Sequence, residues 1–191
     1  YENARQLIWL LGAPLPAAVL QQLHQQLILP TPVLQLVVAG AGNVGAEFLS
    51  MLETQQQRFA AKLNLAAVLN SRRAVLADTI TVADWQTALA AGDSWHAEQL
   101  TAYLQALPAP KVLIDITPSG DFARLYPVFI AAGCDIVSAN KQGVTLPGAE
   151  YQQIKQALVQ HQRQWLSNTT CGAGIPVQRT LQELLSAGDS I

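Results

Sequence analysis

The stretch VVAGAGNVGAEF, residues 37–48, constrains the fold of this chain more than any other part of the sequence. It places a Gly-x-Gly-x-x-Gly motif (40–45) after a β-branched apolar run over 33–40 and before apolar residues at helical spacing over 43–60. In such a strand–turn–helix unit the first glycine permits the tight turn and the second lets the backbone approach a pyrophosphate. The third lets helix and strand pack closely, and free N–H groups at the helix start face the phosphates. The motif predicts a dinucleotide-binding unit; the alternative is a glycine-rich turn without a ligand.

The rest of the chain alternates short apolar runs with helical periodicity, which is typical of a parallel sheet with crossover helices. Further strands are indicated over 63–69, 111–116, 134–139 and 164–168. Helices are indicated over 81–91, 96–107, 122–133, 149–163 and 175–188. Thr81 with Asp84 resembles a capping box at the start of the first of these helices. Pro127 predicts a kink or a late start in the third. We therefore predict a doubly wound, Rossmann-like α/β fold with a mostly parallel sheet.

The first thirty-two residues do not follow this rhythm. They hold a short strand-like run, LIWLL, a helical pattern over 17–29, and a proline-containing linker, LPTP, at 29–32. We predict that residues 1–32 are the tail of an upstream domain or a docking arm, and that residues 33–191 form the nucleotide-binding domain.

Composition excludes several classes of partner. The net charge of −2 and the eleven basic residues argue against nucleic acid as a ligand. No apolar run approaches the ~20 residues that span a bilayer, and the N-terminus lacks the basic start of a signal peptide. Cys134 and Cys171 stand far apart, without metal-ligand spacing, and indicate free thiols in a reducing compartment. We expect a cytoplasmic protein whose partner is a small molecule.

The second predicted strand ends at Asn70-Ser71-Arg72-Arg73. An acidic residue at this place would accept a hydrogen bond from the ribose 2′-hydroxyl of NAD. Two arginines without a carboxylate suit a 2′-phosphate instead, because guanidinium groups make charge-assisted bonds to phosphate oxygens. The turn predicts that NADP(H) is preferred, with NAD(H) possible; the alternative is a solvated basic turn.

Five segments together resemble homoserine dehydrogenase: GAGNVG, NSRR, DITPSGDFARLY, GCDIVSANKQG and LSNTTCGAGIPVQRTLQELLSAGDSI. The resemblance covers residues 33–191. It is closest to the C-terminal half of bifunctional aspartokinase/homoserine dehydrogenase of the methionine-branch type, and residues 1–32 resemble the end of the aspartokinase region. It implies NADPH-dependent reduction of L-aspartate 4-semialdehyde to L-homoserine, in methionine and threonine biosynthesis, by a homo-oligomeric parent. A further substrate-binding and dimerisation domain, which the family has, is absent from this chain. The resemblance therefore implies cofactor binding with little or no turnover by these 191 residues.

The resemblance also implies roles for particular residues. The pyrophosphate would lie on Gly40, Gly42, Asn43, Val44 and Gly45. The adenosine ribose would lie beside Ser71, Arg72 and Arg73. Thr117, Pro118 and Ser119 would line the nicotinamide ribose, and Asn140 and Lys141 match the family's Asn-Lys pair at the substrate.

A glycine turn near the end of the chain would close over cofactor and substrate through Gly172 and Gly174. The resemblance places a sodium ion nearby, on the backbone carbonyls of Cys171, Ala173 and Ile175. Asn168 stands where family members often carry an acidic residue, which weakens this prediction.

Lys141 is one of four lysines and ends the apolar run of the predicted fourth strand. Ligands of open α/β sheets bind at the carboxyl edge, where this lysine and the glycine turn would meet. There an ammonium can donate to a carbonyl oxygen that gains negative charge, and partial desolvation would tune its pKa for proton transfer. The alternative is a lysine that marks the solvent end of a strand. Asp115 is interpreted as an acceptor for backbone donors, and the four tryptophans as packing residues.

Two further functions remain open from the sequence. One is another Rossmann dehydrogenase, such as an aspartate or 3-hydroxy-acid dehydrogenase. The other is a non-catalytic NAD(P)-binding sensor or scaffold, in which residues 1–32 dock to a partner.

Overall fold

The computed structural model describes residues 19, 32–55, 62–167, 169, 175 and 177–188. The chain divides into two compact units, residues 1–32 and 33–191. The strand and helix predicted before residue 30 lie outside the described residues, apart from Val19, which is helical.

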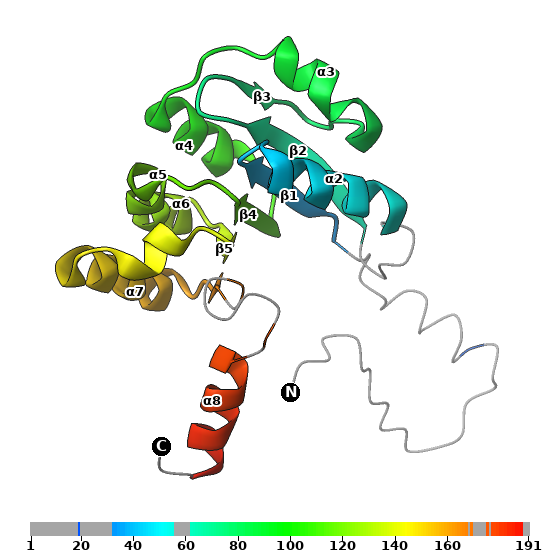
Figure 1. The fold of residues 1–191 in the computed structure, drawn as a ribbon. Helices are drawn as coiled ribbons and strands as arrows, with labels where there is room; N and C mark the ends of the chain where they lie inside the picture. The colour runs from blue at the N-terminus through cyan, green and yellow to red at the C-terminus, as the bar shows by residue number, and fades with distance from the viewer. Residues whose placement is uncertain are drawn as a thin grey trace. The chain divides into compact units, whose positions relative to one another are not determined.

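A six-stranded sheet forms the centre of this unit (Figure 1). Its strands are β1 (Leu34–Ala39), β2 (Leu63–Leu69), β3 (Ala74–Leu76), β4 (Lys111–Asp115), β5 (Asp135–Ser138) and β6 (Trp165–Leu166). They lie in the order β3-β2-β1-β4-β5-β6, and every neighbouring pair is parallel except β2 and β3. Along the sequence, β2 and β3 are added on one side of β1, and β4, β5 and β6 are then added on its other side. The direction in which strands are added therefore reverses between β1 and β4. The predicted doubly wound, mostly parallel α/β fold is confirmed.

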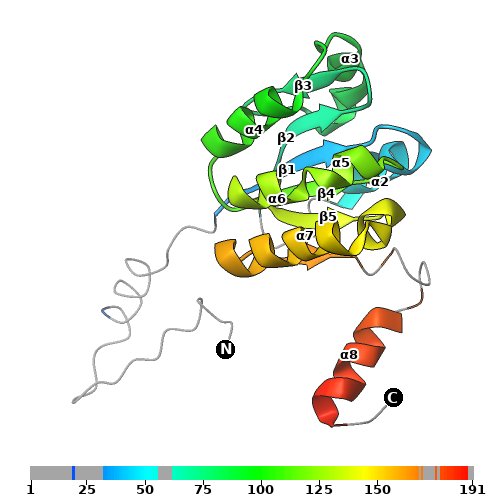
Figure 2. The ribbon, with the colours of Figure 1, turned by 90° about the vertical axis from the view of Figure 1, so that its left-hand side faces the viewer.

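Helices cover both faces of the sheet (Figures 1 and 2). The first face carries α2 (Asn43–Gln55) and α3 (Trp85–Ala90), which follows the 3₁₀ turn η2 (Val82–Asp84). The second carries α4 (Ala97–Ala106), α5 (Gly120–Arg124), α6 (Tyr126–Ala131) and α7 (Gly148–His161). A 3₁₀ turn, η3 (Lys141–Thr145), follows β5, and α8 (Val177–Ala187) ends the described chain. None of these described helices is both long and apolar enough to cross a bilayer.

The central strand β1 shows why the sheet strands are mostly apolar. Leu36 and Val38 pack in the cluster under α2 and α3, whereas Val37 and Ala39 pack in the cluster under α4 to α7. Because successive side chains point to opposite faces, a strand covered on both sides is apolar along most of its length, and Gln35 is the polar exception in β1.

The local predictions hold with three corrections. Pro127 does mark a late start, because it lies in the first turn of α6, so the predicted helix over 122–133 is two short helices. The capping box at Thr81 and Asp84 is wrong: the Thr81 side chain makes no cap hydrogen bond, and a 3₁₀ turn begins there. The third correction is β3, which was not predicted. It is a three-residue strand that pairs antiparallel with β2, too short to show a hydrophobic period.

Candidate functional site

The three glycines of the turn after β1 differ in the space that surrounds their Cα atoms. Gly40 has φ +105°, and a Cβ there would lie 2.7 Å from the Ile116 carbonyl carbon and oxygen at the end of β4. A Cβ at Gly45 would lie 1.9 Å from the Gly40 carbonyl oxygen. A Cβ at Gly42, by contrast, would meet no protein atom within 4 Å. The first and third glycines are thus required by the protein's own backbone, whereas the second leaves space that a ligand can fill.

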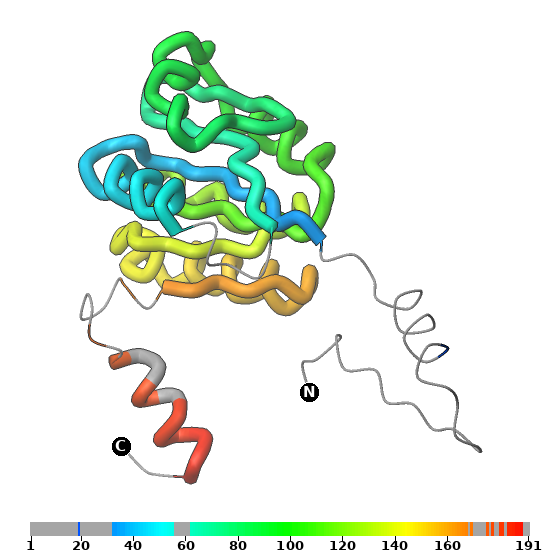
Figure 3. Tube along the Cα trace, turned by 90° about the vertical axis from the view of Figure 1, so that its right-hand side faces the viewer, coloured from blue at the N-terminus to red at the C-terminus, as the bar shows by residue number. Residues whose placement is uncertain are grey.

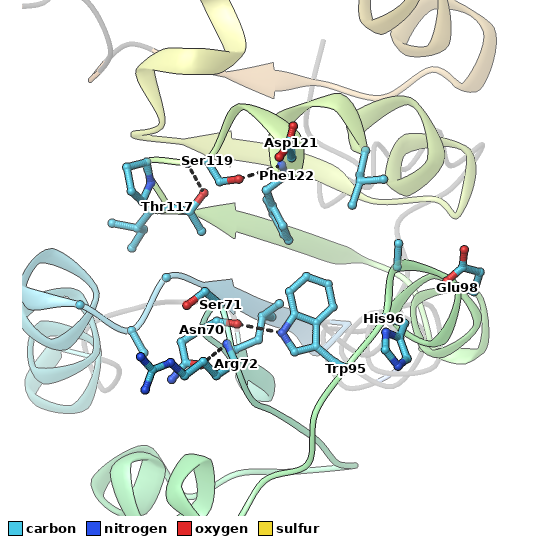
Figure 4. A pocket seen from close by; sticks show the side chains of 18 residues that line it. Asn70, Ser71, Arg72, Trp95, His96, Glu98, Thr117, Ser119, Asp121 and Phe122 are labelled. Carbon is cyan, nitrogen blue, oxygen red and sulfur yellow. Dashed lines mark hydrogen bonds between the residues drawn. The ribbon is translucent and has the colours of Figure 1, made fainter.

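A pocket of about 950 Å³ opens beside this turn (Figure 4). Its walls come from the glycine turn (40–42), the end of β2 (69–72), the segment into α4 (95–98) and the segment after β4 (116–125). All four lie at the carboxyl edge of the sheet, where the strand order reverses. Figure 3 shows the turn between β1 and α2, blue to cyan, projecting at this edge. The volume lies at the upper end of the ~300–1,000 Å³ that is usual for small-molecule sites.

The pocket brings together seven of the fourteen residues predicted to bind the cofactor. The lining includes Gly40, Gly42, Ser71, Arg72, Thr117, Pro118 and Ser119. Asn43 and Val44 are exposed in the first turn of α2, next to the lining, and Gly45 is buried behind it. The lining does not include Arg73, Asn140 or Lys141.

The turn at the end of β2 separates its two arginines. The Asn70 side-chain oxygen accepts from the backbone N–H groups of both Arg72 and Arg73, each at 2.8 Å. The Arg73 guanidinium then donates to the carbonyl oxygens of Ala90, the last residue of α3, and of Gly92 just after it. Arg72 is exposed and lines the pocket. Since the Arg73 guanidinium is bound to backbone carbonyl oxygens, Arg72 is the arginine of this pair whose side chain is available to a ligand in the pocket.

Trp95 is a pocket residue that sequence reasoning took only for packing. Its indole Nε1–H donates to the Asn70 carbonyl oxygen at 2.8 Å, and its ring meets Phe122 edge-on, with centroids 6.1 Å apart. The signal that could have found it is topological. A helix that leads into a parallel strand runs antiparallel to it, so α4 and the residues just before it begin at the carboxyl edge. His96 is exposed and also lines the pocket.

Asp115, at the end of β4, joins three parts of this edge. Its carboxylate is fully buried and accepts from Thr117 N at 2.8 Å, Tyr126 Oη at 2.6 Å and Asn140 Nδ2 at 2.9 Å. Burial, followed by the negative charge of Asp115, raises the pKa of Tyr126, so the phenol stays a donor. The interpretation of Asp115 as an acceptor for backbone donors is confirmed, and two side-chain donors are added.

Asn140 and Lys141, which follow β5, have different environments. Asn140 is buried; its amide donates to the Ser119 carbonyl oxygen at 2.8 Å and its side-chain oxygen accepts from Gln142 N at 3.0 Å. It therefore fixes the loop after β4 to the start of η3. Lys141 is the first residue of η3 and is exposed, at the carboxyl end of a strand two places from β1.

The remaining predicted residues belong to the C-terminal turn. Cys171, Gly172, Ala173 and Gly174 lie outside the described residues, and Ile175 is exposed. Within the described part of the chain, no group of three or more His, Cys, Asp or Glu side chains could hold a metal. Burial raises the pKa of the Cys134 thiol to about 12, as suits a core residue.

A parallel sheet whose order reverses beside a Gly-x-Gly-x-x-Gly turn, with a pocket at the reversal, defines a dinucleotide-binding domain of the Rossmann class. Comparison with known protein families identifies the particular family within this class. The sequence profile of the homoserine dehydrogenase NAD-binding domain matches residues 40–168, and the chain belongs to this family.

Individual relatives agree with this assignment. The chain is 32% identical to bifunctional aspartokinase/homoserine dehydrogenase 2 of Escherichia coli, over 91% of the chain and 22% of the relative. It is 31% identical to homoserine dehydrogenase of Paracoccidioides brasiliensis, over 82% of the chain and 45% of the relative. The chain thus spans less than half the length of either protein.

Solved structures support the fold. Homoserine dehydrogenase from Thermoplasma acidophilum superposes with a TM-score of 0.66 at 20% identity, covering 81% of this chain and 49% of that one. A hyperthermophilic archaeal homoserine dehydrogenase in complex with NADPH gives a TM-score of 0.68 at 16% identity, covering 81% of this chain and 50% of that one.

Proposed function

We propose that this chain is the NADP(H)-binding part of a homoserine dehydrogenase that reduces L-aspartate 4-semialdehyde to L-homoserine. The observation that carries the proposal is the glycine turn opening into a pocket whose β2 side presents Arg72 and no carboxylate. In this proposal the full-length protein is cytoplasmic and homo-oligomeric. It also has an aspartokinase domain and acts in methionine and threonine biosynthesis. The relative from Escherichia coli, whose name gives both activities, supports the aspartokinase part of this proposal.

The residues present fit a dinucleotide phosphate. Gly42 leaves open space beside the N-terminus of α2, whose first-turn N–H groups can donate hydrogen bonds to a pyrophosphate. Ser71 and Arg72 lie on one wall of the pocket and can donate to a 2′-phosphate. Thr117 and Ser119 lie on the facing wall, where their hydroxyls are placed for the second ribose (Figure 4). The bound cofactor would supply the hydride.

The protein's own contribution to the chemistry is positioning and proton donation. The Asp115–Asn140 pair holds the loop after β4 and the start of η3 in a fixed relation. Lys141 follows directly and is proposed to donate from its ammonium group to the substrate oxygen that gains negative charge. A sodium ion on the carbonyls of residues 171, 173 and 175 stays a prediction of the same scheme.

Arg72→Ala is expected to weaken NADPH binding by about 1.5–3 kcal/mol, tenfold or more, and to change NADH binding little. The reason is that the lost guanidinium would serve a phosphate that NADH does not have. Calorimetric titration of both cofactors into the 191-residue chain measures this. The matched control is Arg73→Ala, which should keep the preference and lose about 1 kcal/mol of folding stability with its bonds to Ala90 and Gly92. Equal affinities of the wild type for NADPH and NADH, or tighter NADH, would refute the preference.

Lys141→Ala is expected to lower kcat by about 10²-fold or more while cofactor affinity stays unchanged, because a proton donor and not a cofactor ligand is removed. The assay is NADPH oxidation with and without aspartate 4-semialdehyde, in a polypeptide that joins this domain to a substrate-binding region. Lys155→Ala, on the exposed side of α7, is the control. An unchanged kcat would exclude the proposed role. The 191-residue chain alone should bind NADPH and show little or no turnover, since a misplaced substrate costs ~10²-fold per ångström.

A further inference from the structure

The indole ring of Trp95 belongs both to the protein core and to the pocket. It is half-buried and packs against the apolar cluster under α4 to α7, with its edge-to-face contact to Phe122 on one side. Its Nε1–H is held by the Asn70 carbonyl oxygen, so the ring has a fixed orientation. The same ring lines the pocket (Figure 4). An aromatic face that is immobilised at no cost to the ligand is a preorganised stacking surface.

The position of this ring follows from the covalent structure of a nucleotide. If Arg72 binds a 2′-phosphate, the adenosine ribose lies at the end of β2. The base is attached to the adjacent ribose carbon, C1′, and so must lie within a few bonds of the same turn. Trp95 is hydrogen-bonded to Asn70, two residues before Arg72. In Figure 4 the indole lies beside Asn70, between Ser71 and Arg72 on one side and His96 on the other.

We propose that Trp95 is the adenine-positioning residue of this domain, and that the purine base stacks on its indole face. This inference rests on the proposed function, because it takes the ligand to be an adenine dinucleotide. It assigns Trp95 a contribution to affinity and none to the choice between NADPH and NADH, since both cofactors carry the same base.

The test compares two variants of similar size that both lose the bond to Asn70. Trp95→Leu removes the aromatic surface, and Trp95→Phe keeps one. Base–aromatic stacking is worth ~1–3 kcal/mol, so Trp95→Leu should weaken binding by about 5- to 150-fold. The loss should be alike for NADPH, NADH and adenosine 2′,5′-bisphosphate, each titrated calorimetrically into the full 191-residue chain. Trp95→Phe should bind all three close to wild-type affinity.

Each alternative gives a different pattern. Trp85→Leu is the site control. Trp85 is also half-buried, but it is the first residue of α3 and packs on the other face of the sheet. This variant should bind all three ligands like the wild type. A loss for NADPH but not NADH would mean that Trp95 acts only by holding the turn of Arg72, and would overturn the inference. Equal losses in the Leu and Phe variants would overturn it as well. A wild-type chain that binds none of the three ligands would defeat the proposed function itself.

A second measurement needs only the milder variant. Stacking of a base on an indole changes the fluorescence of the indole. Adenosine 2′,5′-bisphosphate is the suitable ligand, because it has no nicotinamide ring that would interfere with the tryptophan emission. The emission change on adding this ligand should disappear in Trp95→Phe and persist in Trp85→Phe. A change that persists in Trp95→Phe would contradict the inference even if Trp95→Leu did not fold.

Discussion

Asp115→Asn is expected to destabilise this domain by about 2–4 kcal/mol, although the substitution hardly changes the volume of the side chain. The carboxylate is fully buried and accepts three hydrogen bonds, from a backbone N–H, a phenol and an amide. An asparagine must place an NH₂ group against at least one of these donors. Turning the Tyr126 hydroxyl round relieves one conflict, but the Asn140 amide cannot turn without opposing Gln142 N and the Ser119 carbonyl.

Urea unfolding followed by circular dichroism measures this loss. Asp121→Asn is the control, because its ion pair with Arg124 is exposed and such pairs contribute about 0–1 kcal/mol. Cofactor binding should fall together with stability, since Asp115 fixes both the loop after β4 and the start of η3. An unfolding midpoint equal to that of the wild type would show that the three bonds contribute nothing.

Two alanine substitutions in the glycine turn are expected to have opposite profiles. In Gly45→Ala the new methyl would lie 1.9 Å from a backbone oxygen, so the turn must open and both stability and NADPH affinity should fall. In Gly42→Ala the methyl meets no protein atom within 4 Å, so stability should be unchanged within about 0.5 kcal/mol. Its methyl would instead occupy the space that we assign to the pyrophosphate, and NADPH affinity should fall by about tenfold or more.

Thermal unfolding and calorimetric titration of the two variants separate these effects. Gly148→Ala, which also meets no atom within 4 Å and lies at the start of α7 away from the pocket lining, is the control for both. A Gly42→Ala variant that binds NADPH as tightly as the wild type would show that the turn does not hold a phosphate.

The sheet could be predicted because its strands are covered on both faces. A strand such as β2, which is apolar at every position except Asn64 and lies between polar turns, is marked by local composition alone, and its predicted bounds 63–69 match the structure. The glycine turn was predictable for a similar reason. Its first and third glycines answer steric demands of the backbone, and those demands act within a few residues or at an adjacent strand end.

What escaped prediction depends on contacts between distant segments. Arg72 and Arg73 are adjacent and chemically identical in sequence, and only the arrival of α3 beside the turn separates their roles. Trp95 resembles the packing tryptophans in its local sequence, and its place in the pocket follows from the direction of α4. The two side-chain partners of Asp115 lie 11 and 25 residues away, beyond the reach of any local pattern.

The Asn70 side chain has a consequence for how this nucleotide site could change its ligand. Its oxygen secures the backbone of the turn, and its nitrogen is the one atom that separates it from aspartate. Replacing that nitrogen with oxygen would keep the turn and set a free acceptor where a ribose hydroxyl would come. With the proposed preference for NADPH, a lineage that carries this domain would shift toward NADH by a single-nucleotide change in the Asn70 codon, and the fold would stay the same.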